Sequence, residues 1–223
     1  MTIAILTAMD KEHVQILSML SNTKEEHGLF DYTIGTLNNN TFVLSKCGMG
    51  KVNAAVGTSE IIRRYKPDAV ISTGCAGGID PCLNVMDVVV SSKAVHHDFF
   101  SGYEKGQIQG MPTYFDADTR LVKVAESLND PTIHIGLICT GDQFITSKTE
   151  LATIKTDFPE GLAVDMESAA IAQTCFLYNV PFVSFRVISD TPAADGHQQQ
   201  YENFWQEMAQ KSFNTTKLFL QKI

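Results

Sequence analysis

Several features are scarce in this sequence, and each shortage excludes a class of protein. No uninterrupted apolar run approaches the roughly 20 residues of a membrane-spanning helix, so we expect no membrane span. The start, MTIAILTAMDKEH, has neither a basic segment nor a long apolar core, and it predicts no signal peptide. Lysine and arginine number 17 against 25 aspartates and glutamates, a net charge of -8. We expect no nucleic-acid partner, because no basic surplus exists to neutralise phosphates.

Cysteine is also sparse, and its spacing excludes both a disulfide framework and a typical zinc site. The five cysteines are odd in number, scattered and mostly within apolar runs: Cys47, Cys75, Cys82, Cys139 and Cys175. None belongs to a CxxC pair, and the pattern is typical of reduced thiols in a cytoplasmic protein. His96-His97-Asp98 suggests a metal motif, but adjacent histidines on a strand point to opposite faces. We therefore expect neither a metal nor a cofactor.

The composition is that of one packed globular domain. Of 223 residues, 44% are hydrophobic and 19% are charged, which suits a folded protein with a substantial core. No linker, low-complexity tract or internal repeat interrupts the sequence. We expect a single domain over residues 1–223.

Short apolar runs alternate with segments of helical periodicity. Strands are predicted at Ile3–Leu6, 30–36, 41–47, Ala69–Thr73, Val88–Ser91, His134–Cys139 and Phe182–Ile188. Helices are predicted at Asp10–Leu20, Gly50–Tyr65, Ser147–Thr156, Met166–Tyr178 and from about Tyr201 to Leu220. Residues 99–117 are expected to form a long surface loop. The alternation predicts an α/β fold with a central mixed, largely parallel β-sheet flanked by helices on both faces.

Polar residues that suit a buried environment poorly follow several predicted strands. Glu12 comes shortly after the first strand, and Cys75 lies among glycines just after Ala69–Thr73. Ser189 and Asp190 end the last strand. Ligands of open α/β sheets bind outside the carboxyl ends of the strands. We therefore expect these residues to meet in one site.

Arg186 lies inside the last apolar run, where a buried guanidinium requires carboxylate partners. We expect it to anchor Glu12 or Glu167; the alternative is an edge-strand residue whose guanidinium reaches water. Glu167 alone could simply balance a helix dipole, and Asp190 could cap a following helix. Cys75 and its glycines could simply permit a tight turn. The joint placement at strand ends favours the functional interpretation.

Five short blocks follow one another along the chain. They are Ala8-Met9-x-x-Glu12, Thr73-Gly74-Cys75-Ala76-Gly77-Gly78, Thr140-Gly141-Asp142-Gln143-Phe144-Ile145, Val164-Asp165-Met166-Glu167 and Arg186-Val187-Ile188-Ser189-Asp190. Their order and spacing resemble the 5′-methylthioadenosine/S-adenosylhomocysteine nucleosidases of the nucleoside phosphorylase superfamily. The resemblance implies a central mixed sheet, a homodimer, and hydrolysis of the N-glycosidic bond of a small-molecule adenine nucleoside.

The resemblance also implies catalytic roles. Asp190 would protonate adenine N7, while Glu12, helped by Arg186 and the residue at position 75, would position the attacking water. Glu167 and Met166 would bind the ribose hydroxyls. An acid at the leaving base and a carboxylate near the sugar suit a reaction that passes through an oxocarbenium-like state.

The remaining implied contacts surround the base and the 5′ end of the substrate. Phe144 would stack on adenine, and the Ile145 backbone would hydrogen-bond the purine edge. The other implied substrate-binding positions are Met9, Met49 and Tyr201, which would line the 5′-alkylthio pocket, together with Val164, Cys75, Ala76, Gly77 and Ser189.

The sequence departs from the family at two places. Serine is usual at position 75, where this chain has cysteine, a poorer hydrogen-bond donor. The segment between Asp98 and Gly102 is shorter than usual, and Phe99 and Phe100 are the candidates for the aromatic that reaches the partner subunit's pocket.

Three other functions fit the same fold. A purine nucleoside phosphorylase would need basic residues around phosphate, and the Ser72–Cys75 segment supplies none. A non-catalytic nucleoside-binding sensor would be expected to lose the acid or the carboxylate that handles water, whereas Glu12 and Asp190 are both present. A 6-amino-6-deoxyfutalosine nucleosidase would share the hydrolytic site.

Overall fold

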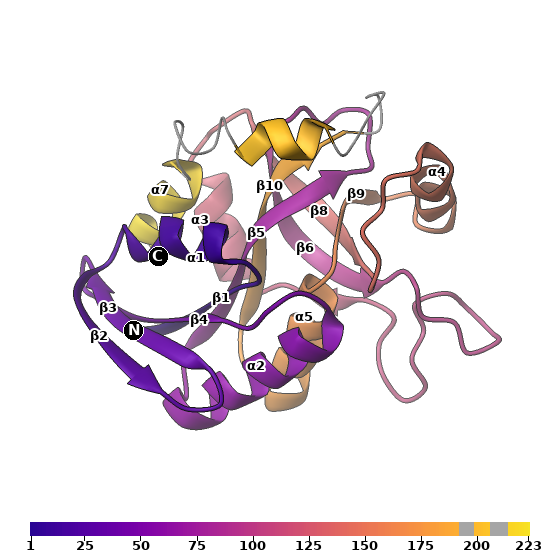
Figure 1. Ribbon diagram of the computed structural model, residues 1–223. Coiled ribbons are helices and arrows are strands. Elements are labelled where there is room, and N and C mark those ends of the chain that lie inside the picture. The colour runs from indigo at the N-terminus through magenta and orange to yellow at the C-terminus, as the bar shows by residue number, and fades with distance from the viewer. Residues whose placement is uncertain (192–198, 206–213) are drawn as a thin grey trace.

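The computed structural model describes residues 1–191, 199–205 and 214–223, which form an α/β fold around one mixed sheet (Figure 1). The strands run in the spatial order β10-β6-β8-β9-β5-β1-β4-β3-β2, and β7 pairs with β6. Their bounds are β1 Thr2–Thr7, β2 Ser21–His27, β3 Asp31–Leu37, β4 Asn40–Lys46, β5 Ala69–Gly78, β6 Val88–His96, β7 Phe115–Asp116, β8 Ile133–Thr140, β9 Gly161–Asp165 and β10 Phe182–Asp190.

Part of the sheet closes on itself. β10 pairs with β5 as well as with β6, so β5, β9, β8, β6 and β10 form a ring of paired strands. In this ring β10 runs parallel to β5 with Arg186 opposite Gly74, while Asp190 pairs with Gly77 beyond a shift of register. The pairing brings the polar ends of β5 and β10 together, as the sequence predicted.

Helices cover both faces of the sheet. They are α1 Asp10–Leu17, α2 Lys51–Tyr65, α3 Thr119–Glu126, α4 Lys148–Asp157, α5 Ser168–Tyr178 and α7 Asn214–Lys222. Figure 1 shows α2 and α5 on one side and α1, α3 and α7 on the other. The alternation of side chains along a strand explains both cores, since Ile3 and Ile5 pack in the cluster under α1 and α3, and Ala4 and Leu6 in the cluster under α2 and α5.

Several elements differ from the sequence-based expectations. Five of the ten strand pairings in the described part of the chain are parallel, so the sheet is mixed but not largely parallel. β2, β7, β9 and α3 were not predicted. β2 is a polar, mostly exposed edge strand and therefore lacks an apolar alternation, and β9 and β7 are short. Residues 206–213 of the predicted last helix, and residues 192–198 after Asp190, lie outside the described residues. Within the described part of the chain, no helix is long and apolar enough to cross a membrane.

Candidate active site

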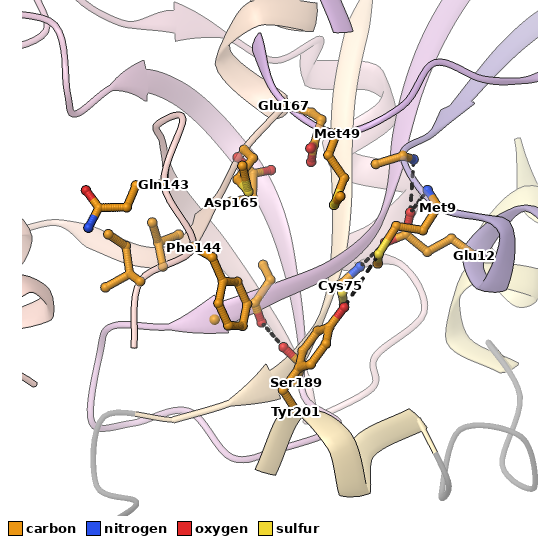
Figure 2. Close-up of a pocket in the computed structure, with 16 residues that line it drawn as sticks. Met9, Glu12, Met49, Cys75, Gln143, Phe144, Asp165, Glu167, Ser189 and Tyr201 are labelled. Atoms are coloured by element: carbon orange, nitrogen blue, oxygen red, sulfur yellow. Dashed lines mark hydrogen bonds between the residues drawn. The ribbon is translucent and has the colours of Figure 1, made fainter. Parts of the chain in front are cut away.

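A pocket opens where β1, β5, β9 and β10 end, and Figure 2 shows the side chains around it. It encloses about 560 Å³ of empty space, its open mouth included. The lining residues are Ala8, Met9, Glu12, Met49, Cys75, Ala76, Gly77, Gln143, Phe144, Ile145, Val164, Asp165, Met166, Glu167, Ser189 and Tyr201. These include every predicted substrate-binding residue. Two predicted catalytic residues, Arg186 and Asp190, lie in the buried layer behind the lining.

Glu12 is fixed at the floor of the pocket by backbone donors. One carboxylate oxygen, Oε2, accepts from the N–H groups of Ala8 at 2.9 Å and Met9 at 3.0 Å, which closes the first turn of α1. The other oxygen, Oε1, accepts from the N–H of Cys75 at 3.0 Å. A side chain at Gly74 would place its Cβ 2.3 Å from Glu12 Oε1, so only glycine fits there. These contacts hold an almost fully buried carboxylate in one orientation at the pocket wall.

Arg186 is buried, and its main partner is a residue that the sequence analysis did not select. Its Nε lies 2.9 Å from Asp165 Oδ2, and its Nη2 lies 3.5 Å from Glu167 Oε2. The expectation that Arg186 anchors Glu12 or Glu167 is confirmed by the contact with Glu167. Glu12 is not the partner: within the described residues Arg186 and Glu12 form no ion pair, although both approach Gly74. The edge-strand alternative is also wrong, because β10 lies between β5 and β6 and Arg186 is only 1% exposed.

Asp165 was missed because its strand was missed. It ends β9, a five-residue strand, and it follows Val164 in a block from which only Val164, Met166 and Glu167 were selected. Placing β9 between β8 and β5 would have put Asp165 at the same sheet edge as the other site residues.

Glu167 has fewer hydrogen-bond donors than Glu12. Its Oε1 accepts from the backbone N–H of Gly50 at 3.1 Å, just before α2 begins. Burial raises the pKa of Glu167 from its ordinary value of 4.5 to about 7, although the Arg186 guanidinium opposes the rise. Glu167 can therefore gain or lose a proton near neutral pH.

Asp190 lies against the glycine wall of the pocket. A Cβ at Gly77 would sit 3.2 Å from Asp190 Oδ2, and Gly77 itself lines the pocket. The Ser189 hydroxyl lies 2.7 Å from Asp190 Oδ1 and 3.2 Å from the carbonyl oxygen of Ala76, and its single hydrogen can be donated to either. Glycine at position 77 thus lets a ligand approach a carboxyl group that is only 3% exposed.

Cys75 contributes a neutral thiol. Burial, and then the negative charge of Glu12, raise the pKa of the Cys75 thiol well above its ordinary value. A thiolate nucleophile is therefore disfavoured at this position, since the thiolate is the reactive form.

Aromatic side chains cover the mouth of the pocket. The rings of Phe144 and Tyr201 meet edge to face, with centroids 5.3 Å apart, and the Tyr201 hydroxyl lies 3.5 Å from the sulfur of Met9. Figure 2 shows Tyr201 between Phe144 on one side and Met9 on the other. Half of the Phe144 surface remains exposed, so a flat ring has access to it.

The two adjacent histidines do not form a metal site. His96 pairs with Gln173 of α5 at 3.0 Å, whereas the ring of His97 packs over Gly141. Across the described ranges, no group of three histidine, cysteine or carboxylate side chains is placed to hold a metal ion.

Comparison with known proteins places this site in a family. Residues 2–221 match the model of the phosphorylase superfamily. The chain is 40% identical to the 5′-methylthioadenosine/S-adenosylhomocysteine nucleosidase of Anoxybacillus flavithermus, over 100% of this chain and 99% of the relative. The S-adenosylhomocysteine nucleosidase of Streptococcus pyogenes, solved with 5-methylthiotubericidin, superposes with a TM-score of 0.93 at 33% identity, over 100% of this chain and 97% of that one.

A second solved structure agrees. The 5′-methylthioadenosine/S-adenosylhomocysteine nucleosidase of Neisseria meningitidis, in complex with methylthio-immucillin-A, gives a TM-score of 0.91 at 36% identity, over 100% of this chain and 99% of that one. The chain therefore belongs to the phosphorylase superfamily and, within it, to the 5′-methylthioadenosine/S-adenosylhomocysteine nucleosidases.

Proposed function

We propose that this site hydrolyses the N-glycosidic bond of 5′-methylthioadenosine and S-adenosylhomocysteine, releasing adenine and the 5-thioribose product. One observation carries the proposal: among the residues that the structure describes, the pocket is lined by three carboxylates, Glu12, Asp165 and Glu167, and by no lysine or arginine. Such a wall can activate water and stabilise positive charge on a sugar, and it repels an attacking phosphate.

Asp190 and Glu12 divide the proton transfers between them. The C1′–N9 bond breaks with its electron pair moving to adenine, and Asp190 donates a proton to N7 of the departing base. Glu12 takes a proton from water as the water oxygen bonds to C1′. Its three backbone contacts, one of them from Cys75, orient the carboxylate for that role. The Arg186 guanidinium lies beside Glu12 at Gly74 and is proposed to help position the water. Proton transfers of this kind contribute about 10²–10⁴-fold in rate.

The remaining lining residues bind the substrate. Glu167 and Met166 take the ribose hydroxyls, and Phe144 stacks on the adenine while the Ile145 backbone bonds its edge. The 5′-alkylthio group lies among Met9, Met49 and Tyr201, where two thioethers and an aromatic ring offer an apolar surface. The walls between base and sugar are completed by Val164, Cys75, Ala76, Gly77 and Ser189.

The geometry disfavours two of the alternatives. A phosphorylase would need a cation available to phosphate, and the Arg186 guanidinium is 1% exposed and occupied by Asp165 and Glu167. A non-catalytic sensor would have no use for a carboxylate as tightly oriented as Glu12 beside a second acid at Asp190.

A homodimer in the cytoplasm is also proposed. Large apolar side chains stand exposed along the paired helices α2 and α5, where Val52 is 75% and Leu177 59% exposed. Phe100, in the loop between β6 and β7, is 63% exposed and available to a partner's pocket. The five free thiols of the chain are typical of a protein in a reducing compartment such as the cytoplasm.

Sedimentation equilibrium tests the proposed homodimer. We expect twice the chain mass, and a monomer at micromolar concentration would contradict the proposal.

An adenine-release assay tests the function directly. The purified protein is offered 5′-methylthioadenosine, S-adenosylhomocysteine and inosine in turn, and free base is measured by chromatography. We expect adenine from the first two and no hypoxanthine from inosine, because the site is proposed to read an adenine edge. Release of base from none of the three would support the sensor alternative.

A further inference from the structure

Arg186 has two carboxylate partners that are not equivalent. Asp165 faces Nε at 2.9 Å, whereas Glu167 faces Nη2 at 3.5 Å, and Nη2 donates instead to the hydroxyl of Ser72 at 2.7 Å. The shorter ion pair is therefore made by a residue that ends β9, and the longer one by the residue at the start of α5. The guanidinium is oriented mainly by Asp165.

Asp165 is fully occupied by the protein. Its Oδ1 accepts from the Thr140 hydroxyl at 2.6 Å, and its Oδ2 accepts from the Ser168 hydroxyl and from Arg186. The backbone N–H of Ser168 lies 3.2 Å and 3.3 Å from the two oxygens. Although Asp165 touches the pocket, its side chain is 1% exposed, so no oxygen remains for a sugar.

The carboxylate oxygens of Glu167, in contrast to those of Asp165, accept few hydrogen bonds from the protein. Among the described residues, its oxygens meet only one backbone N–H, that of Gly50, and the longer contact to Arg186. Charged groups face it from three elements: Arg186 on β10, Asp165 on β9 and Glu12 on α1. The thiols of Cys47 and Cys75 face it from the loop after β4 and from β5. Burial raises the pKa of Cys47 to about 12 and that of Cys75 well above the ordinary value, so both thiols stay neutral.

We propose that Asp165 is a positioning residue: by engaging Arg186, it leaves Glu167 free to bind the ribose hydroxyls and to release a proton as it does so. This inference rests on the proposed function, because it assigns the sugar to Glu167. A carboxylate accepts two hydroxyl hydrogens, whereas a protonated acid must use one oxygen as a donor. The ionised form of Glu167 is therefore the one that binds the sugar.

A pH dependence follows. In the free enzyme, burial and the neighbouring carboxylates raise the pKa of Glu167 to about 7. The affinity for a sugar-containing ligand should fall as the pH drops below this value, and we call this fall the acidic limb of the binding profile. The affinity for the base alone should not show this limb. Removing the charge of Asp165 takes away a negative neighbour of Glu167 and leaves Arg186 to pair with Glu167. Both changes lower the pKa of Glu167, so the acidic limb should move to lower pH.

Calorimetric titration between pH 5.5 and 8.5 tests the inference. The ligands are adenine and an adenine C-nucleoside, whose carbon–carbon bond between base and sugar cannot be hydrolysed. For the unmodified protein, we expect affinity for the C-nucleoside to fall about tenfold per pH unit below the limb. For Asp165→Asn, we expect the limb about one pH unit lower. Thr140→Val, which removes a hydrogen bond to Asp165 without changing its charge, should leave the limb in place.

Two outcomes would overturn the positioning role. Asp165→Asn could weaken C-nucleoside binding equally at every pH, which is what a merely structural role produces. The limb could also persist in Glu167→Gln, which decides the matter even if Asp165→Asn fails to fold. Binding of neither ligand at any pH would overturn the proposed function, and the inference with it.

Discussion

The N–H of Cys75 donates to Glu12 Oε1 at 3.0 Å, and this bond joins the start of α1 to the end of β5 at the pocket floor. The contact depends on the backbone at position 75 and not on its side chain. A cysteine side chain at position 75 is therefore compatible with this orientation of Glu12.

Glu12→Gln should lower kcat by about 10²–10⁴-fold, because an amide cannot take the proton from water. One of its NH2 hydrogens would also face a backbone N–H that Glu12 now satisfies, so a modest loss of thermal stability is expected. Steady-state kinetics and a melting curve measure the two effects. Asp10→Asn, an exposed carboxylate on the same helix, is the matched control, and a comparable loss of kcat there would contradict the assignment.

Gly74→Ala should abolish most of the activity. Its new Cβ would lie 2.3 Å from Glu12 Oε1 and 2.8 Å from Arg186 Nη1, so both groups must move. We expect kcat/KM to fall at least about 100-fold, since small displacements in a preorganised site are that costly. Gly136→Ala on β8, where the clash is with the Leu162 side chain, separates stability from catalysis: it should lower Tm but leave kcat/KM within a few-fold.

Glu167 should make folding stability depend on pH. Because burial raises its pKa from 4.5 to about 7, the folded protein keeps this proton to higher pH than the unfolded chain. The contribution of protonated Glu167 to the free energy of unfolding is fully present below about pH 4.5, and it is lost as the pH rises through about 7. Relative to the unmodified protein, Glu167→Gln should gain about 3 kcal/mol in unfolding free energy between these limits.

Denaturant unfolding at pH 5 and at pH 8 measures that difference. The exposed Glu126→Gln serves as the control, and its difference in unfolding free energy from the unmodified protein should be the same at the two pH values. A constant difference between Glu167→Gln and the unmodified protein would mean that Glu167 stays ionised throughout.

The thiols should differ sharply in reactivity. Cys82 is exposed, whereas burial and the charge of Glu12 keep Cys75 protonated and unreactive. Mass spectrometry after brief treatment with an alkylating reagent at pH 7.5 should show one modified thiol, and none in Cys82→Ser. Activity should survive the treatment; inactivation that Cys75→Ser prevents would show that Cys75 is reactive after all.

Much of the fold was predictable because its central strands are apolar and end in polar residues. β1 and the β3–β4 hairpin were placed correctly, and the last strand was placed correctly up to its polar end. β2 was missed because SNTKEEH is an exposed edge strand with no buried face, so its pairing with β3 depends on backbone hydrogen bonds rather than on side-chain pattern. β5 and β6 also run past their predicted ends, since strand pairing continues through residues of low strand propensity such as Gly77 and Gly78.

The sequence motifs placed the predicted substrate-binding residues in one pocket, but they did not select Asp165 and did not predict the charge arrangement. The motifs indicated Glu12, Glu167, Arg186 and Asp190, yet which carboxylate meets the guanidinium depends on a strand order that the sequence does not display. Asp165 reaches Arg186 because β9 lies between β8 and β5. That neighbour relationship is tertiary, and no spacing along the chain encodes it.

The central claim is hydrolysis of an adenine nucleoside by water, and one measurement tests it most directly. The protein is incubated with 5′-methylthioadenosine in ¹⁸O-labelled water, with and without a large excess of phosphate over the substrate. The products are analysed by mass spectrometry. We predict equal rates of adenine release in both buffers and a free sugar that carries ¹⁸O at C1′. Phosphate-dependent release with formation of a sugar 1-phosphate would contradict the account and show the chain to be a phosphorylase.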